Sequence, residues 1–361
     1  MEMNDLFFEL LQVASGHRRV LSYTPDKDEW YELYRTADMQ TLIGICFSGI
    51  KKLEVQDQKP PADLYMQWLS STAAIQQRNE LMNVKCSELQ NKLHQLGYKS
   101  CILKGQGIAY QYPQGLGSIR QSGDIDVWLE GGIDSLLALY KSMGRQTKIT
   151  EQHGEIVFFD GVEVEVHYRP SMLKDPFANR ILQKWFKEQE TKQFSNVNTQ
   201  GLCVPTTEFN LVYLLIHIYR HLFGEGVGLR QLMDYYAVLF STNDKVLHKR
   251  TMKLLHSMHL HDFAGGLMWV LQRVYLLEEE RLLCVPNEKH GRFLLNEILR
   301  SGNMGKYDDR LKTLGTTSKL KHFIYINRHT FRLLRYYPRE TLFAPLTRIW
   351  IWMWRKKNGW N

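Results

Sequence analysis

Apolar side chains recur at helical spacing throughout the first hundred residues. Residues 3–20 carry one such pattern. A longer pattern begins behind Pro60 and Pro61 and ends near Gly97, a residue that suits the left-handed backbone after a helix. We therefore expect residues 1–98 to form an N-terminal helical region. The apolar stripe of its long helix would consist of Trp68, Leu69, Ala73, Ile75, Leu81, Leu89, Leu93 and Leu96.

The pattern changes between residues 99 and 170, where short apolar runs alternate with glycine-rich turns. Asp160-Gly161 lies between two of these runs, and this dipeptide between alternating apolar positions is a strong hairpin signal. A helical pattern over residues 133–143 ends at a glycine. The predicted order is strand, helix, strand, helix and hairpin, which gives a small mixed β-sheet. The expected strands cover residues 100–103, 124–129, 156–159 and 162–168.

Residues 171–361 return to helical patterns and are expected to form a C-terminal helical domain. Either Thr206 or Thr207 can cap one helix, and residues 229–240 form another. The fold class predicted from the whole pattern is α+β, a small sheet flanked by helical regions on both sides. The three expected segments are residues 1–98, 99–170 and 171–361.

The last of these segments ends in an aromatic and basic stretch. Its tryptophans, Trp350, Trp352 and Trp354, are spaced by two residues, which does not build one face of a helix. We expect this stretch to pack its aromatic side chains on the core. The alternative is weak contact of its Trp and Lys residues with a membrane surface.

The composition of the 361 residues is that of an ordinary globular protein, with 44% hydrophobic and 23% charged residues. This excludes a disordered chain, a collagen-like fibre and a small disulfide scaffold. The five cysteines contain no CxxC pair, and no apolar run reaches the length of a membrane span, so a reduced, soluble, cytoplasmic protein is expected. The net charge of +8 favours anionic partners. Because the basic residues are spread along the chain, charge alone does not indicate a nucleic-acid binder.

The strongest chemical signal is the pair Asp124 and Asp126. In a strand these two side chains point to the same face, where two carboxylates repel each other unless a cation lies between them. Mg²⁺ (or Mn²⁺) prefers carboxylate oxygens together with water and phosphate. The alternative is a solvated strand end whose acids only face water.

The strand over residues 162–168 adds a third carboxylate. Its valines form an apolar face, while Glu163, Glu165, His167 and Arg169 line the other face. If this strand pairs beside the first with polar faces aligned, the cluster has the composition of a two-metal site. An edge strand with one solvated face is the alternative.

Two loops add positive charge suited to phosphate. Lys104-Gly105 lies between a strand and a helix expected to start at Ile108-Ala109-Tyr110, and backbone N–H groups and a lysine can meet an anion there. Arg120 lies four residues before Asp124 and could hold a triphosphate. Each of these features is also common in turns and solvated loops.

In this order the motifs resemble the polymerase-beta-like nucleotidyltransferase superfamily, and most closely its bacterial branch of uncharacterised nucleotidyltransferases. The resemblance covers roughly residues 99–169, and the segment from Gly228 to Asp234 also resembles that branch. The residues that carry it are Leu103-Lys104-Gly105, Tyr112-Pro113, Arg120 with Asp124-Ile125-Asp126, and Val164-Glu165-Val166-His167.

The resemblance implies a metal-dependent transfer of an NMP group from a nucleoside triphosphate to a hydroxyl acceptor, with release of pyrophosphate. It implies Asp124, Asp126 and Glu165 as catalytic metal ligands, with Glu163 as the competing third carboxylate. Lys104, Gly105, Gln106 and Arg120 would bind the nucleotide. The acceptor would be a sugar, a small molecule, a protein or RNA.

One departure from the superfamily keeps other functions open. Gly105 is followed by Gln106, where the superfamily has Gly-Ser or Gly-Gly. A binding or toxin-type module without turnover is therefore one alternative. A DxD glycosyltransferase is another, although the segment between residues 99 and 169 is short for the larger sheet that it requires.

The helical segments supply candidates for an acceptor pocket. The resemblance implies His221, Arg230 and Asp234 there, and His167 could orient the acceptor. His217 and His221 are four residues apart and could form half of a metal site, but no Glu completes an HExxH motif, so core or pocket histidines are expected. Arg230 and Asp234 have the spacing of an ion pair on one helix face.

Overall fold

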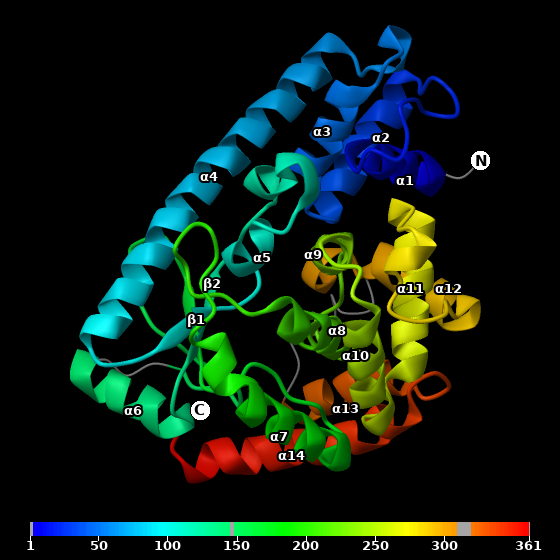
Figure 1. Ribbon diagram of the computed structural model, residues 1–361. Coiled ribbons are helices and arrows are strands. Elements are labelled where there is room, and N and C mark those ends of the chain that lie inside the picture. Colours follow the sequence, from blue (N-terminus) through cyan, green and yellow to red (C-terminus); the bar gives the residue numbers. More distant parts are fainter. Residues whose placement is uncertain (1–2, 145–147, 309–318, 361) are drawn as a thin grey trace.

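A small sheet lies among helices in an α+β fold (Figure 1). The computed structural model describes residues 3–144, 148–308 and 319–360. The N-terminal helices are α1 (Met3–Ala14), α2 (Lys27–Met39), α3 (Ile43–Lys52) and α4 (Ala62–Gln95). The longer helices that follow are α6 (Gly132–Met143), α7 (Pro176–Gln193), α8 (Thr207–Leu222), α9 (Leu229–Phe240), α10 (Lys245–Ser257), α11 (His261–Tyr275), α12 (Glu288–Ser301), α13 (Lys319–Phe331) and α14 (Pro338–Lys357).

Helix α4 runs along one edge of the molecule and joins the N-terminal helices to the sheet (Figure 1). It begins directly behind Pro61 and ends as predicted, with Gly97 in the left-handed conformation at φ +85° and the Tyr98 N–H bonded to the Leu93 carbonyl. The predicted apolar stripe is too wide, because only one side of the helix faces the protein. Trp68, Leu89 and Leu93 are buried, whereas Leu69, Leu81 and Leu96 are exposed.

The sheet has four strands in the order β1-β2-β4-β3. The central pair is parallel, with Asp126 of β2 beside Glu165 of β4, and the two outer pairs are antiparallel. Short helix α5 (Gln106–Ala109) follows β1, and α6 connects β2 to the hairpin, which confirms the predicted order of elements. The strands are β1 (Ser100–Ile102), β2 (Ile125–Leu129), β3 (His153–Glu155) and β4 (Val164–His167).

The third strand lies earlier in the chain than predicted. Residues 156–159 do not form it; residues 153–155 do, and the segment up to Val162 makes a longer connection around the Asp160-Gly161 turn. Phe158 and Phe159 lie under the ammonium groups of Lys92 and Lys85 on α4, and Phe159 keeps only a single bridge, to Val162. The apolar pattern of these residues therefore serves contact with a helix more than strand pairing.

The C-terminal helices share one hydrophobic core with α1, α2 and α3. A second core lies between the sheet, α4 and α6. Trp128 of β2 joins the sheet to the helical part, because its ring stacks on Phe209 of α8 and contacts Phe186 of α7. Thr206 supplies the predicted cap of α8, its side chain accepting a hydrogen bond from the Phe209 N–H.

The last helix only partly meets the expectation of aromatic packing on the core. Trp354 lies against the second core and contacts Trp360, but Trp350 and Trp352 are 48% and 57% exposed. Trp350 and Trp354 are one turn apart and their rings stack, whereas the spacing of two residues directs Trp352 to another side of α14. None of the described helices is both long and apolar enough to cross a membrane.

We predict that Gly107→Ala destabilises the sheet end that carries the candidate chemistry. A Cβ at this position in α5 would lie 2.2 Å from the backbone oxygen of Ile102 in β1, so strand and helix must separate. The expected loss in the free energy of unfolding is about 1–3 kcal/mol, typical of overpacking. Chemical denaturation measures it, with Gly123→Ala as the control because a Cβ there meets nothing within 4 Å. Equal stability of the two variants would contradict this packing.

Candidate active site

Three carboxylates meet at the centre of the sheet. Asp124 and Asp126 come from β2 and the residue before it, and Glu165 comes from the neighbouring parallel strand. One oxygen from each lies within 4.8 Å of the others. Of the two glutamates that the sequence left open, Glu165 belongs to this group, whereas the Glu163 side chain is exposed.

Two positive groups from neighbouring elements compensate the clustered charge. The Lys104 Nζ lies 3.1 Å from Asp126 Oδ1. The His167 Nε2 lies 2.9 Å from the same oxygen and 3.3 Å from Glu165 Oε2. Lys104 therefore meets the carboxylates from the end of β1, and His167 reaches both of them from β4.

These contacts set the charge states of the cluster. Burial alone would raise the pKa of Asp126 and Glu165, but Lys104 and the hydrogen bonds from His167 outweigh it, so both values fall, that of Glu165 to about 2. Burial alone would lower the pKa of Lys104 and His167, but the same carboxylates raise both values. The acids are therefore ionised at neutral pH and held by charged partners.

His153 is a member of this group that the sequence analysis missed. In β3 it lies opposite His167, its ring stacks on that of His167 at 5.0 Å, and its Nδ1 lies 3.2 Å from Glu165 Oε2. Burial and the neighbouring His167 lower its pKa to about 4. The sequence placed the strand three residues too late, which left His153 in a loop. With Glu165 and His167 it forms a second cluster of potential metal donors.

Asn79 of α4 fixes the loop that leads into Asp124. Its side-chain amide donates to the backbone oxygens of Ser118 and Arg120, both at 2.7 Å, and its oxygen accepts from the Ser122 hydroxyl. The only sign of this role in the sequence was the position of Asn79, a polar residue among the apolar positions of the long helix. On the same helix Asn83 accepts a hydrogen bond from the Gln106 amide at 2.7 Å.

Arg120 is directed into the protein and not toward the carboxylates. It is 4% exposed and donates two hydrogen bonds to Asp234 of α9, at 2.6 and 2.8 Å. The Tyr112 hydroxyl donates to the same carboxylate. The expected ion pair between Arg230 and Asp234 is therefore wrong, because Asp234 pairs with Arg120. Arg230 instead donates to the backbone oxygen of Gln121.

The residues expected in an acceptor pocket lie in different places. His167 is at the carboxylates, and Arg230 and Asp234 hold the loop before Asp124. His221 lines a separate cavity, in which none of these three is among the lining residues. Of the nucleotide-binding candidates, Lys104 and Gly105 adjoin the carboxylates, whereas Arg120 and Gln106 are bonded to protein groups.

One buried face of α8 connects the carboxylates to this cavity. Tyr213, His217 and His221 are spaced by four residues, and burial raises the pKa of Tyr213 and lowers that of both histidines. The charge of Asp126 adds to the shift at Tyr213, and His221 lies 3.4 Å from Glu225. Neither histidine belongs to a cluster of metal donors within the described residues, so the half-site stays incomplete there.

A family model matches the part of the chain that contains these residues. The model described as "Uncharacterised nucleotidyltransferase" matches residues 26–275, well over half of the chain. The chain belongs to this nucleotidyltransferase family. The match includes both strands with the carboxylates, the loop before Asp124, and helices α8 and α9. No match was found among the curated proteins or the solved structures.

We predict that Arg120→Met lowers the free energy of unfolding by about 3–5 kcal/mol, because it leaves the Asp234 carboxylate buried without its partner. The double variant Arg120→Met with Asp234→Leu should lose less free energy of unfolding than the two single variants lose together. Denaturant titrations of all three give the coupling energy.

The matched control is the exposed pair Arg19 and Glu54, at 3.1 Å. Breaking it with Arg19→Met should change stability by at most about 1 kcal/mol. An Arg120→Met variant that keeps its stability but loses nucleotide binding would contradict this prediction. It would indicate that Arg120 binds the triphosphate, as the sequence analysis expected.

Proposed function

We propose that this protein is a divalent-metal-dependent nucleotidyltransferase with a polymerase-beta-like core. It would transfer an NMP group from a nucleoside triphosphate to a hydroxyl acceptor and release pyrophosphate. The observation that carries the proposal is the meeting of Asp124, Asp126 and Glu165 on two parallel, adjacent strands. The family match over residues 26–275 supports the same class of reaction.

The three carboxylates suit a hard divalent cation such as Mg²⁺ or Mn²⁺. Their oxygens are close enough to share one ion, and the lowered pKa values of Asp126 and Glu165 keep them available as ligands. Ions held there would stabilise charge on the transferred phosphate and lower the pKa of the acceptor hydroxyl, as in two-metal enzymes.

The remaining steps fall to the chain's own side chains. The acceptor hydroxyl would lose its proton to water, its oxygen would attack the α-phosphorus, and the bond from the α-phosphorus to the oxygen that bridges to the β-phosphate would break, so that pyrophosphate leaves. Lys104 and the backbone at Gly105 adjoin the carboxylates and would hold phosphate oxygens. His167 holds Asp126 and Glu165 in place. With a pKa of about 2, Glu165 is better suited to bind a cation than to accept a proton.

Two other functions compete with this proposal. A binding or toxin-type module without turnover is favoured by Gln106, whose amide is engaged by Asn83 at the start of α5. A DxD glycosyltransferase is disfavoured, since the described residues contain one four-stranded sheet with β2 and β4 as its only parallel pair. Cytoplasmic location and the division into segments 1–98, 99–170 and 171–361 remain part of the proposal.

The decisive test is incubation with labelled ATP, GTP, CTP and UTP in Mg²⁺ or Mn²⁺, with sugars, small hydroxyl compounds, RNA and the protein itself as acceptors. We expect pyrophosphate release that EDTA abolishes. Asp124→Asn, Asp126→Asn and Glu165→Gln should each lower the rate by about 100-fold or more, because each removes a ligand of the transferring site.

The matched control is Glu163→Gln, a residue directly before β4 whose exposed side chain lies outside the cluster. It should keep near-normal activity. The proposal fails if no nucleotide binds to the folded protein in the presence of metal. It also fails if the Asp124 and Asp126 variants retain full turnover.

We further propose weak contact of α14 with an anionic membrane surface. Most of the exposed apolar residues of this helix, Trp352 excepted, follow one face, and Lys356 and Lys357 continue that face at its end. Cations beside apolar side chains complement the headgroups and acyl boundary of anionic lipid. The apolar residues of the face are Leu342, Leu346, Ile349, Trp350 and Met353.

Sedimentation with vesicles tests this contact. The wild-type chain should bind vesicles with about 30% phosphatidylserine more tightly than neutral ones, with K ≈ 10⁴ M⁻¹ as an order of magnitude. Leu346→Ser with Trp350→Ser should remove the binding. The control Leu69→Ser changes an exposed apolar residue on α4. Equal binding of wild type and the α14 variant would rule the contact out.

A further inference from the structure

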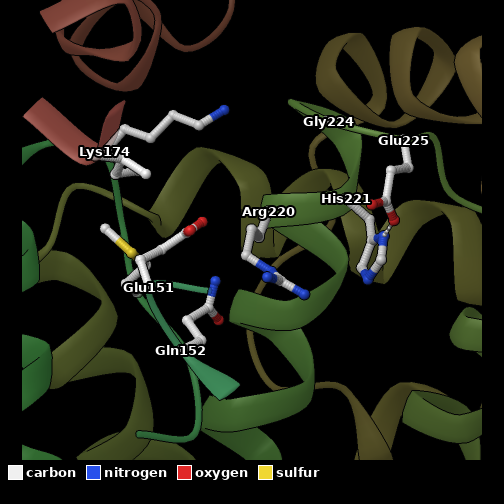
Figure 2. A pocket seen from close by; sticks show the side chains of 9 residues that line it. Glu151, Gln152, Lys174, Arg220, His221, Gly224 and Glu225 are labelled. Carbon is white, nitrogen blue, oxygen red and sulfur yellow. Dashed lines mark ion pairs between the residues drawn. The ribbon is translucent and has the colours of Figure 1, made fainter. Parts of the chain in front are cut away.

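A cavity of about 160 Å³ opens beside the candidate active site (Figure 2). The loop before β3, the start of the segment after β4, the end of α8 and α14 all contribute to its wall. We propose that this cavity binds a phosphate group of the substrate. The inference rests on the proposed function and adds to it a second binding position away from the carboxylates. The wall is formed by Glu151, Gln152, Met172, Lys174, Arg220, His221, Gly224, Glu225 and Ile351.

The first argument is uncompensated positive charge. Figure 2 shows Lys174 and Arg220 on different parts of the cavity wall, the first at the upper left and the second in the centre of the view. Within the described chain, neither has a carboxylate partner within 4 Å. The Lys174 Nζ donates to the backbone oxygen of Phe223 and lies over the ring of the same residue. Of the two acids of the wall, Glu151 is paired with Arg355 at 2.5 Å, and the Glu225 carboxylate lies 3.4 Å from the His221 Nδ1. An anion would supply the acidic partner that Arg220 and Lys174 lack within 4 Å.

The second argument is hydrogen-bonding capacity that the described residues leave unused. The Arg220 Nε–H is buried without an acceptor, which an anion would supply. The Gln152 Oε1 and the His221 Nε2 are also buried without a partner, and as acceptors they suit a hydroxyl group or a water beside that anion. Unsatisfied buried polar atoms are costly and call for a ligand or water. Gln152 and His221 are 2% and 6% exposed, so both atoms belong to the built wall and not to a mobile surface.

Two connections join the cavity to the carboxylates. Gln152 precedes His153, whose Nδ1 lies 3.2 Å from Glu165. On α8, Tyr213 and His221 are two turns apart, about 12 Å along the axis, and Tyr213 faces the charge of Asp126. A substrate that spans this distance would place one phosphate in the cavity and its reacting group at the carboxylates.

The environment of Lys174 fits an anion as well. Burial, and next the charge of Arg348, lower its pKa to about 7, while Glu340 opposes the shift. A phosphate beside the amine would raise the Lys174 pKa again and so oppose the effects of burial and of Arg348. The same phosphate chemistry can come from two sources, the terminal phosphates of the nucleoside triphosphate or a phosphorylated acceptor.

Calorimetric titration with inorganic pyrophosphate in EDTA tests the cavity without the metal-dependent reaction. We expect Lys174→Met and Arg220→Met to weaken binding by about 10- to 100-fold, the loss of a charge-assisted hydrogen bond. Lys174→Arg should retain most of the binding. The controls Lys187→Met and Arg180→Met change exposed cations of α7 and should bind as the wild type does.

The two sources separate in a second arm, which uses an α,β-methylene nucleoside triphosphate with Mn²⁺. If the cavity variants weaken its binding as they weaken that of pyrophosphate, the nucleotide's own phosphates occupy the cavity. If they leave it unchanged and pyrophosphate binds together with the nucleotide, the phosphate belongs to the acceptor. Pyrophosphate binding that is identical in wild type and both cavity variants overturns the proposal.

The experiments distinguish failure of the proposed nucleotidyltransferase function from failure of the proposed phosphate site. Asp126→Asn should lose Mn²⁺ binding, followed by electron paramagnetic resonance, but keep pyrophosphate binding in EDTA. If the Lys174 and Arg220 variants do not fold, wild-type crystals soaked in sodium selenate decide. An anomalous peak between these two side chains supports the site, and no peak there overturns it.

Discussion

The parallel pairing of β2 and β4 is the constraint on which the candidate site depends. This register sets Asp126 beside Glu165 and directs Asp124 to the same face, so three acids share a small volume. Such a cluster repels itself, and burial raises the cost further. The structure offsets this cost with Lys104 and His167, which contact the same carboxylate oxygen of Asp126 from two different elements. The chemistry of the site and the stability of the sheet centre are therefore coupled.

The helical parts act on this pair at a distance. Asn79 of α4 holds the loop ahead of Asp124 by two backbone oxygens, and Asp234 of α9 holds the same loop through Arg120. This loop is rich in glycine, and without these contacts from α4 and α9 its backbone would have many conformations. Helices from both ends of the chain thus restrict the approach to the carboxylates, and the face of α8 extends the site to the cavity at Lys174 and Arg220.

Local patterns predicted much of the fold and part of the site. The order of elements around the sheet, the end of α4 at Gly97, the cap at Thr206 and the polar face of β4 all follow from short-range rules. Three predictions failed for one reason: the surroundings of these side chains depend on segments that are distant in sequence. Phe158 and Phe159 pack on α4 and not into a strand, Arg120 pairs with Asp234, and the tryptophans of α14 divide between core and solvent.

By itself the sequence determined which residues could share a face, because the periods of strand and helix are fixed by backbone geometry. That was enough to single out Asp124, Asp126 and a glutamate of the following hairpin, and to indicate the nucleotidyltransferase family. Only the tertiary structure decided between Glu163 and Glu165, brought His153 and Asn79 to the site, and left Lys174 and Arg220 without acidic partners. Such choices depend on strand register and on contacts between distant segments, which no local pattern encodes.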